Sequence, residues 1–294
     1  MFLDGHGERK PDGIANHDLG TFGKRLAAAG IKTNTVRLAE VQDVPANAAL
    51  LVIASPQVDL LPAEVAKIHR FLEGGGHLLW MIDQEPLHGL QPIADYLGIQ
   101  LSPGIAVDPA AQALRQPATL AVSSAYGQQH PALRGFTLST AFPFARRIAY
   151  SEGNKTWRFT PLVQVAQTGW LETSPVGDSV AFDKNRDVPG PITVASALER
   201  EVQGRDQRIV VTGSGHFLAN TYIGLLGNLD LGMNLVNWLA GDDDLVTIQA
   251  RPLIDGSLQL TRASLIFIAL FFLIALPGLF LFAGGMIFWR RRKA

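Results

Sequence analysis

Four short stretches of the sequence place polar side chains directly after apolar segments of strand length. Carboxylate, imidazole and hydroxyl groups are the types that bind cations, exchange protons or attack a substrate. Open α/β sheets bind ligands beyond the carboxyl ends of their strands, so side chains in these positions converge on one edge of such a sheet. The candidate residues of this cleft are Asp4, His6, Glu8, Ser55, Asp83, Glu85, Ser214 and His216.

The first stretch, DGHGE at residues 4–8, alternates potential metal ligands with glycines. Histidine and carboxylates can hold a cation, but three side chains in one turn without a second cluster are a weak signal for a metal site. A tight turn with a polar tip is the alternative that we favour. The sequence therefore predicts neither a metal nor a cofactor.

The last stretch, TGSGH at residues 212–216, matches a nucleophile elbow only in part. An elbow has glycine two residues before and two residues after its serine, whereas Thr212 and His216 occupy those positions around Ser214. A serine beside glycine at the start of a helix can also bind an anion. A structural turn is the default interpretation, and we predict no catalytic residue.

Composition and missing motifs exclude several classes of protein. The chain has no cysteine, which removes disulfides, thiolate metal sites and a cysteine nucleophile. Residues 74–76 are a glycine run without the lysine of a phosphate loop, so no ATP site is expected. The acidic run at 242–244 lacks the spacing of a calcium loop. A net charge of −1 without a basic stripe excludes nucleic acid as a partner.

The elements that must position the candidate residues alternate between strand and helix. Apolar runs at 49–54 and 77–82 have the length and composition of buried parallel strands. Helical spacing of apolar residues, with glycine or proline at the ends, predicts helices at 17–29, 62–73, 89–97 and 230–239. We therefore expect an α/β fold with a mostly parallel sheet and helices on both faces, in which residues 98–107 return to the sheet.

The pattern changes at residue 108. Residues 108–190 are rich in proline, glycine, serine and threonine, with β-like runs at 118–122 and 161–165, which predicts an irregular β-rich insertion. Strands at 191–198 and 208–212 then resume the α/β pattern. The predicted parts are an α/β half (1–107), the insertion (108–190), an α/β completion ending in a β-hairpin (191–262) and a membrane anchor (263–294).

Residues 265–289 predict a transmembrane helix. No charged residue lies between Arg262 and Arg290, and a bilayer core of about 30 Å needs about 20 apolar residues in a helix. Pro277 is tolerated in such helices, and Trp289 suits the membrane interface. The anchor runs from Leu265 to Trp289 and is followed by the basic residues Arg290, Arg291, Arg292 and Lys293.

This basic flank predicts the orientation of the chain. Basic residues favour the cytoplasmic side, so we expect a cytoplasmic tail and an extracytoplasmic domain at a bacterial inner membrane. Residues 1–8 read as a strand end without a basic or apolar leader. We expect a further segment ahead of them; the alternative is a tail-anchored protein whose domain stays in the cytoplasm.

Several stretches together resemble the GldG-like auxiliary components of gliding-motility-type ABC transporters. They are FLDGHGE at 2–8, LLVIASPQVDLLPAEV at 50–65, FLEGGGHLLWMID at 71–83, GPITVASALE at 190–199, RIVVTGSGHFLAN at 208–220 and GNLDLGMNLVNWLAGDDDLVTI at 227–248. The resemblance implies an extracytoplasmic α/β domain similar to class I glutamine amidotransferases, with a flavodoxin-like sheet. It also implies a position beside a permease and a cytoplasmic ATPase, and it carries no established catalytic residues.

Three functional hypotheses follow. The first is a non-catalytic auxiliary subunit of an ABC export system, which binds substrate or a partner. The second is a membrane-anchored hydrolase that uses Ser55, Asp83, His6 or His216, which requires a serine or carboxylate within about 3 Å of a histidine in a concave pocket. The third is a module that binds an envelope polymer.

Overall fold

The computed structural model describes residues 1–241 apart from 84–85, 114–115, 152, 154 and 175–180, and also residues 271–278, 284, 286 and 290–292. The chain divides into two units, Met1–Ala250 and Arg251–Ala294. Each unit is described by itself below.

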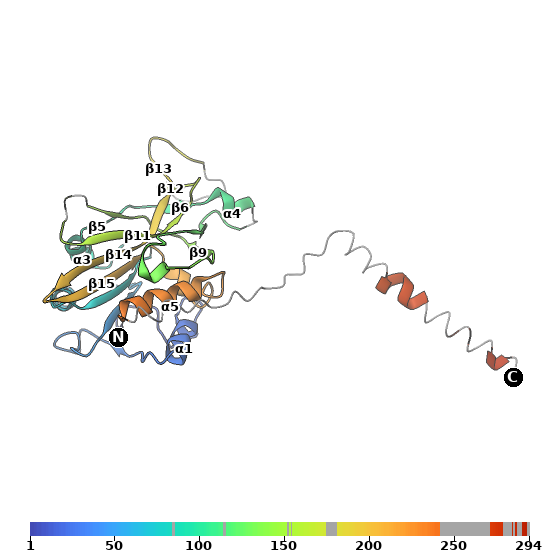
Figure 1. Cartoon of the computed structure of the whole chain (residues 1–294), viewed down its shortest axis with the longest axis horizontal. Coiled ribbons are helices and arrows are strands. Elements are labelled where there is room, and N and C mark those ends of the chain that lie inside the picture. Colours follow the sequence, from blue (N-terminus) through green and yellow to red (C-terminus); the bar gives the residue numbers. More distant parts are fainter. Residues whose placement is uncertain are drawn as a thin grey trace. The chain divides into compact units, whose positions relative to one another are not determined.

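An eight-stranded sheet forms the centre of the first unit (Figure 1). Its strands, in spatial order, are β2 (Thr35–Val36), β1 (Phe2–Leu3), β3 (Leu50–Ala54), β4 (His77–Met81), β15 (Arg205–Thr212), β14 (Ile192–Val202), β11 (Arg158–Val165) and β8 (Ala125–Tyr126). The first five run parallel to one another, and the last three continue the sheet in antiparallel pairs. The predicted α/β fold with a mostly parallel sheet is therefore confirmed, with an antiparallel extension that the sequence did not predict.

Helices cover both faces of this sheet. Helices α1 (Gly20–Ala28) and α5 (Asn228–Leu239) lie together on one face, where Phe22 and Trp238 join a buried cluster with Val52 of β3. On the other face, α2 (Pro62–Glu73) and α3 (Gln91–Leu97) bury apolar side chains against Leu51 of the same strand. Because successive strand residues point to opposite faces, a continuous apolar run is required for a strand buried on both sides.

Helix α2 begins and ends where the sequence predicts. Pro62 occupies its first turn, where a missing N–H has no cost. The carboxylate of Glu64 accepts the backbone N–H of Leu61 at 2.9 Å and so satisfies a free donor of the helix start. The helix stops at the glycine run, and Gly75 takes a φ of +90°, which L-residues rarely adopt.

Residues 98–190 build several small sheets as well as part of the large one. Strand β5 (Ile99–Leu101) pairs with β10 (Ile148–Tyr150), β6 (Ile105–Val107) with β12 (Trp170–Glu172), and β7 (Leu120–Ser123) with β9 (Thr140–Pro143); β12 also pairs with β13 (Val188–Pro189). The expectation that residues 98–107 return to the large sheet is wrong, because β5 and β6 find their partners in these small sheets. Strands β8 and β11 of the same region do join the large sheet. The region also contains two short helices, α4 (Pro109–Ala113) and η1 (Pro131–Leu133).

Strands β14 and β15 form one long antiparallel hairpin. Its turn is Gln203–Gly204, and both residues have positive φ, 52° and 76°. Two positive φ values at the centre of a two-residue loop match the twist of the strands that the loop connects.

In the second unit, a π-helical turn spans Phe271–Ala275. Among the described residues, no helix is long and apolar enough to cross a membrane. Most of the predicted 265–289 span, including Leu265 and Trp289, lies outside the described residues, as does the predicted β-hairpin before it.

Candidate ligand cleft

A cleft of about 1350 Å³ opens at the carboxyl ends of β1, β3, β4 and β15. The chain leaves β1 through α1 on one face of the sheet and leaves β3 through α2 on the other, so the strand order changes direction between β1 and β3. Open α/β sheets bind ligands at such a switch point. The opposite wall comes from residues 103–105, 119, 144, 146 and 172–174 of the region between α3 and β14.

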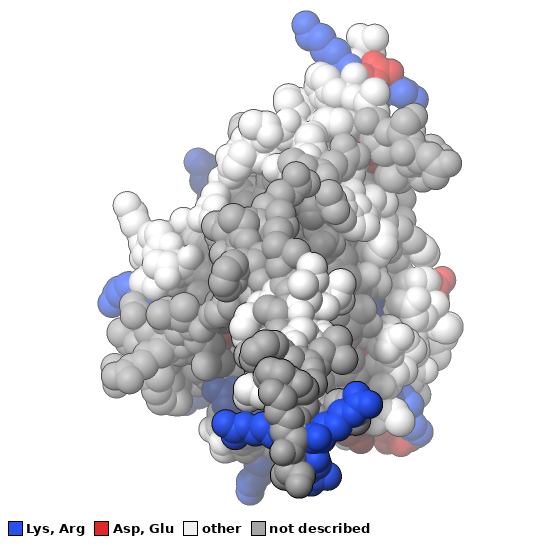
Figure 2. Space-filling view, turned by 90° about the vertical axis from the view of Figure 1, so that its right-hand side faces the viewer, with Lys and Arg blue, Asp and Glu red and all other residues white. Residues whose placement is uncertain are grey.

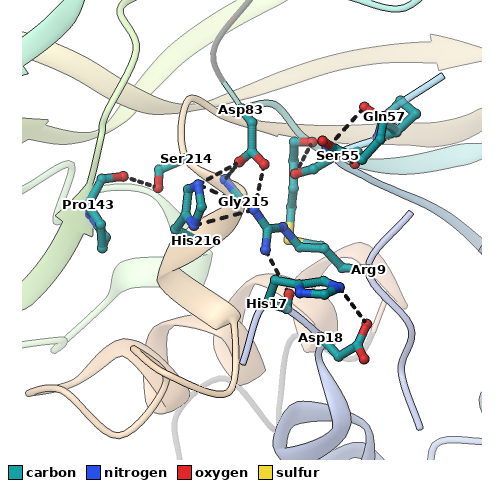
Figure 3. Close-up of polar contacts among 12 residues, drawn as sticks. Arg9, His17, Asp18, Ser55, Gln57, Asp83, Pro143, Ser214, Gly215 and His216 are labelled. Carbon is teal, nitrogen blue, oxygen red and sulfur yellow. Dashed lines mark hydrogen bonds and ion pairs between the residues drawn. The ribbon is translucent and has the colours of Figure 1, made fainter. Parts of the chain in front are cut away.

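An ion pair between Arg9 and Asp83 forms the floor of this cleft (Figure 3). Nη2 of Arg9 donates to Oδ2 of Asp83 at 2.5 Å, and Nη1 donates to the carbonyl of His17 at 2.7 Å. Oδ1 of Asp83 accepts the backbone N–H of Gly215 at 3.0 Å. Loops that follow β1, β4 and β15 are thus joined through one carboxylate.

His216 lies beside this pair. Its ring nitrogens are both 3.3 Å from Nη2 of Arg9, and Nε2 is 3.8 Å from Oδ1 of Asp83, beyond hydrogen-bond distance. Burial lowers the pKa of His216, and this effect exceeds the opposing effect of the Asp83 charge; Arg9 and His17 lower the pKa further. The ring is therefore neutral at pH 7, with one donor and one acceptor nitrogen.

Gly215 is required by the close approach of two loops. A Cβ at this position would lie 2.1 Å from Oγ of Ser55 and 3.0 Å from Oδ1 of Asp83. Ser55, the first residue after β3, is 2% exposed, and its Oγ donates to the carbonyl of Met81 at 3.4 Å. No side chain larger than hydrogen fits here without moving this part of the cleft.

Strained backbone gathers around the cleft. Six described residues other than glycine have positive φ, and three of them, Ser55 (53°), His88 (49°) and Phe144 (52°), line it. This conformation costs about 1–2 kcal/mol for most L-residues. Strain of this kind is concentrated at ligand sites, where the surrounding structure holds it in place.

A family model described as an ABC-type uncharacterized transport system, in which the protein is the auxiliary component, matches residues 1–237. The chain belongs to this family. The matched range contains the whole eight-stranded sheet, the cleft and most of α5. The family indicates an auxiliary component of an ABC-type transport system, which agrees with the broader part of the resemblance in the sequence.

One solved structure shares the fold at low sequence identity, and a second shows a weaker similarity. The mmIFT52 N-terminal domain is 15% identical with a TM-score of 0.59, and the match covers 81% of this chain and 96% of that one. A putative ThuA-like protein from Bacteroides uniformis ATCC 8492 is 14% identical with a TM-score of 0.45, covering 81% of this chain and 89% of the other. No curated protein matches the chain significantly.

In this family member, the candidates predicted from sequence divide into two groups. Ser55, Asp83 and His216 line the cleft. Ser214 is fully buried and turned away, since its Oγ donates to the carbonyl of Pro143 at 2.6 Å (Figure 3). Asp4 pairs with Nε of Arg37 at 2.8 Å near the edge strand β2, and Glu85 lies outside the described residues.

His6 and Glu8 belong to a separate contact beneath the loop after β1. Nδ1 of His6 is 3.3 Å from Oε1 of Glu8, and Nε2 is 3.0 Å from Oε2 of Glu64 at the start of α2. This contact fixes the loop to α2. In the part of the chain that the structure describes, no group of three or more histidine, aspartate or glutamate side chains is placed to hold a metal ion.

The hydroxyls of both candidate serines donate to backbone carbonyls. Base-activated attack requires a hydrogen bond from the serine to its base. The chemistry that the described side chains support best is recognition of a ligand by fixed hydrogen-bonding groups.

Arg9, Gln57 and Phe144 are cleft residues that the sequence analysis missed. Arg9 follows the DGHGE stretch directly, so a basic residue just after a strand-end turn was an available signal. No signal in the sequence pointed to Phe144, because it lies inside the region predicted as irregular and the small sheets of that region bring it to the cleft.

Proposed function

We propose that this auxiliary component is a non-catalytic, GldG-like subunit of an ABC export system whose cleft binds the transported substrate or a segment of a partner. The observation that carries the proposal is the Arg9–Asp83 pair at the carboxyl edge of the sheet. Its charges are directed at each other and at backbone groups, which suits a fixed binding surface. Family membership supplies the transport context.

Residues 263–294 are the proposed membrane anchor. The sequence of this segment supports a spanning helix followed by a basic cytoplasmic tail, with the α/β domain outside the cytoplasmic membrane. A permease and a cytoplasmic ATPase are the proposed partners. In the space-filling view, most of the described residues that face the viewer are uncharged, and a group of basic side chains lies in the lower foreground (Figure 2). A broad basic face for nucleic acid is not seen among the described residues in that view.

Affinity purification from membranes tests this assignment. The full chain, tagged at its N-terminus and extracted in mild detergent, should recover a permease and an ATPase, identified by mass spectrometry. A variant whose residues 263–294 are replaced by an unrelated spanning helix should stay in the membrane and recover less of both. If the native chain recovers neither subunit, the proposed function is wrong.

Topology needs its own measurement. In intact spheroplasts, external protease should degrade the α/β domain and spare a tag on the C-terminal tail. Protection of the domain until the membrane is lysed would place it in the cytoplasm and contradict the proposal.

A further inference from the structure

We infer that the cleft binds an uncharged, polyhydroxylated ligand with the chemistry of a neutral glycan chain. The inference rests on the proposed function and names the ligand class of the same cleft. Three observations support it: the charges of the lining residues balance, the strands that end at the cleft have no open edge, and the floor and wall carry hydrogen-bonding and aromatic groups.

Among the described residues, the lining of the cleft presents no excess charge. Its described lining contains two arginines, Arg9 and Arg146, and two acidic residues, Asp83 and Glu172. Arg9 and Asp83 neutralise each other. The two carboxylate oxygens of Glu172 accept from the indole of Trp170 at 3.1 Å and from the N–H of Ser174 at 2.9 Å, and Nε of Arg146 donates to the carbonyl of Ser102 at 3.2 Å. The formal charges of these four residues sum to zero, so neither an anion nor a cation meets an excess of opposite charge in the described lining.

Two common modes of recognition do not fit this cleft. Anions bind free helix N-termini, but the nearby start of α2 is capped by the carboxylate of Glu64. Extended peptides bind by adding a strand to an open sheet edge. The strands of the large sheet that end at the cleft, β1, β3, β4 and β15, each have a neighbour on both sides.

The groups on the cleft floor match hydroxyls. A hydroxyl both donates and accepts; the ring N–H of His216 can donate to it, while the other ring nitrogen can accept the hydrogen bond from Nη2 of Arg9 at 3.3 Å. Each oxygen of Asp83 accepts one protein hydrogen bond and can accept another, because a carboxylate oxygen has two lone pairs. His216 and Asp83 are both partly accessible, with side chains 28% and 17% exposed.

Phe144 supplies an aromatic wall. Phe144 is partly exposed and has strained backbone, and its ring lies 5.4 Å from the ring of His216 at an angle of 62°. The backbone N–H of Phe144 donates to the carbonyl of Thr119 at 2.8 Å, which holds this conformation. The negative face of an aromatic ring attracts the C–H groups of a sugar ring, so Phe144 beside His216 and Asp83 combines stacking with hydroxyl recognition.

The size of the cleft favours a chain of sugars over a single one. Pockets for small molecules are typically about 300–1,000 Å³. The volume of about 1350 Å³ exceeds that range and extends between the sheet edge and the opposite wall. An oligosaccharide of several units fills such a space.

A glycan array that carries neutral and anionic oligosaccharides, together with immobilised oligopeptides, tests the inference with the full chain in detergent. We expect retention on neutral oligosaccharides, followed by a binding constant from calorimetry for the best of them. Retention on anionic glycans or peptides alone, or no retention on any neutral glycan, would overturn the inference.

Variants locate the binding in the cleft. Phe144→Leu keeps an apolar side chain but removes the ring, and it should weaken binding of the selected oligosaccharide by about tenfold. Phe182→Leu removes an exposed ring that packs on Trp170 and does not line the cleft, so binding should stay unchanged. Unchanged binding by folded Phe144→Leu would refute the site. Recovery of permease and ATPase, measured separately, distinguishes failure of this inference from failure of the proposed function.

Discussion

Arg9 and Asp83 form an ion pair at 2.5 Å although they are 74 positions apart in the sequence. Both side chains are largely buried, at 5% and 17% exposed. Burying two charges is costly, and the pair is stable because each member also bonds to a backbone group, His17 for the arginine and Gly215 for the aspartate.

Removing one charge should therefore destabilise the domain. Asp83→Asn leaves the Arg9 guanidinium buried without a counterion, and we expect a loss of about 3 kcal/mol in the free energy of unfolding, measured with urea. The control, Asp43→Asn, breaks the exposed Arg70–Asp43 pair and should cost less than about 1 kcal/mol. Equal losses in the two variants would mean that burial adds nothing to the Arg9–Asp83 pair.

Gly215→Ala should strain the cleft floor. The new methyl group would overlap Oγ of Ser55, so we expect a cost of about 1–3 kcal/mol in thermal or urea unfolding. Gly224→Ala is the control, because a Cβ there meets nothing within 4 Å.

A double variant separates this steric effect from a general loss of flexibility. Ser55→Gly removes the overlapping hydroxyl and suits the positive φ of that position. In the Ser55→Gly, Gly215→Ala protein, most of the cost of the alanine should disappear. If the two effects simply add, the predicted contact does not limit residue 215.

Asn228 joins the start of α5 to the strand β9 and the η2 turn (Gly215–Leu218). Its buried amide accepts from the N–H of Ala141 and donates to the carbonyls of Ala141, Phe217 and Tyr222, all within 3.1 Å. Asn228→Ala should cost about 3 kcal/mol, because several buried backbone groups lose their partner. Asn237→Ala on the same helix should change stability by less than about 0.5 kcal/mol. A small effect at Asn228 would show that water or a rearranged turn replaces the amide.

Stability should fall in mild acid. Burial is the main cause of a lowered pKa at His77, His130 and His216. The unfolded chain then binds protons at a higher pH than the folded one, so the free energy of unfolding decreases as pH falls below about 6.5. Urea unfolding at several pH values between about 7.5 and 5 measures this slope.

One substitution tests which histidine contributes. Nδ1 of His77 accepts the N–H of Arg208 at 3.0 Å, and an asparagine oxygen can replace that acceptor without titrating. The His77→Asn protein should lose less stability in acid than the native chain. An unaltered slope in His77→Asn would remove this residue from the explanation.

Much of the parallel half could be predicted from local sequence. The strands at 50–54 and 77–81 are continuous apolar runs, and helix 62–73 has both a proline start and a glycine stop. The edge of the sheet that carries Ser55, Asp83 and His216 followed from the rule that parallel strands end together. These features depend on short-range patterns.

The antiparallel half depends on pairings between distant residues. The β-like run at 161–165 predicts part of β11, but its start at Arg158 and its pairing with β14 have no local signal. The hairpin of β14 and β15 did have a local signal, the Gln203–Gly204 turn, which the sequence analysis did not use. Ser214 and His216 are two residues apart and point to different places, which depends on the turn geometry at Gly215 and could not be read from spacing.

The cleft floor also sets a condition on biosynthesis. Arg9 and His216 are 207 positions apart, and the carboxylate between them is held by Gly215 near the end of the domain. A nascent chain that has emerged only as far as β14 has neither β15 nor the turn that follows it, so its Arg9 lacks the contact with His216 and its Asp83 lacks the N–H of Gly215. Such long-range contacts form late in folding. The floor of the cleft is therefore completed only after nearly the whole α/β unit has been synthesised.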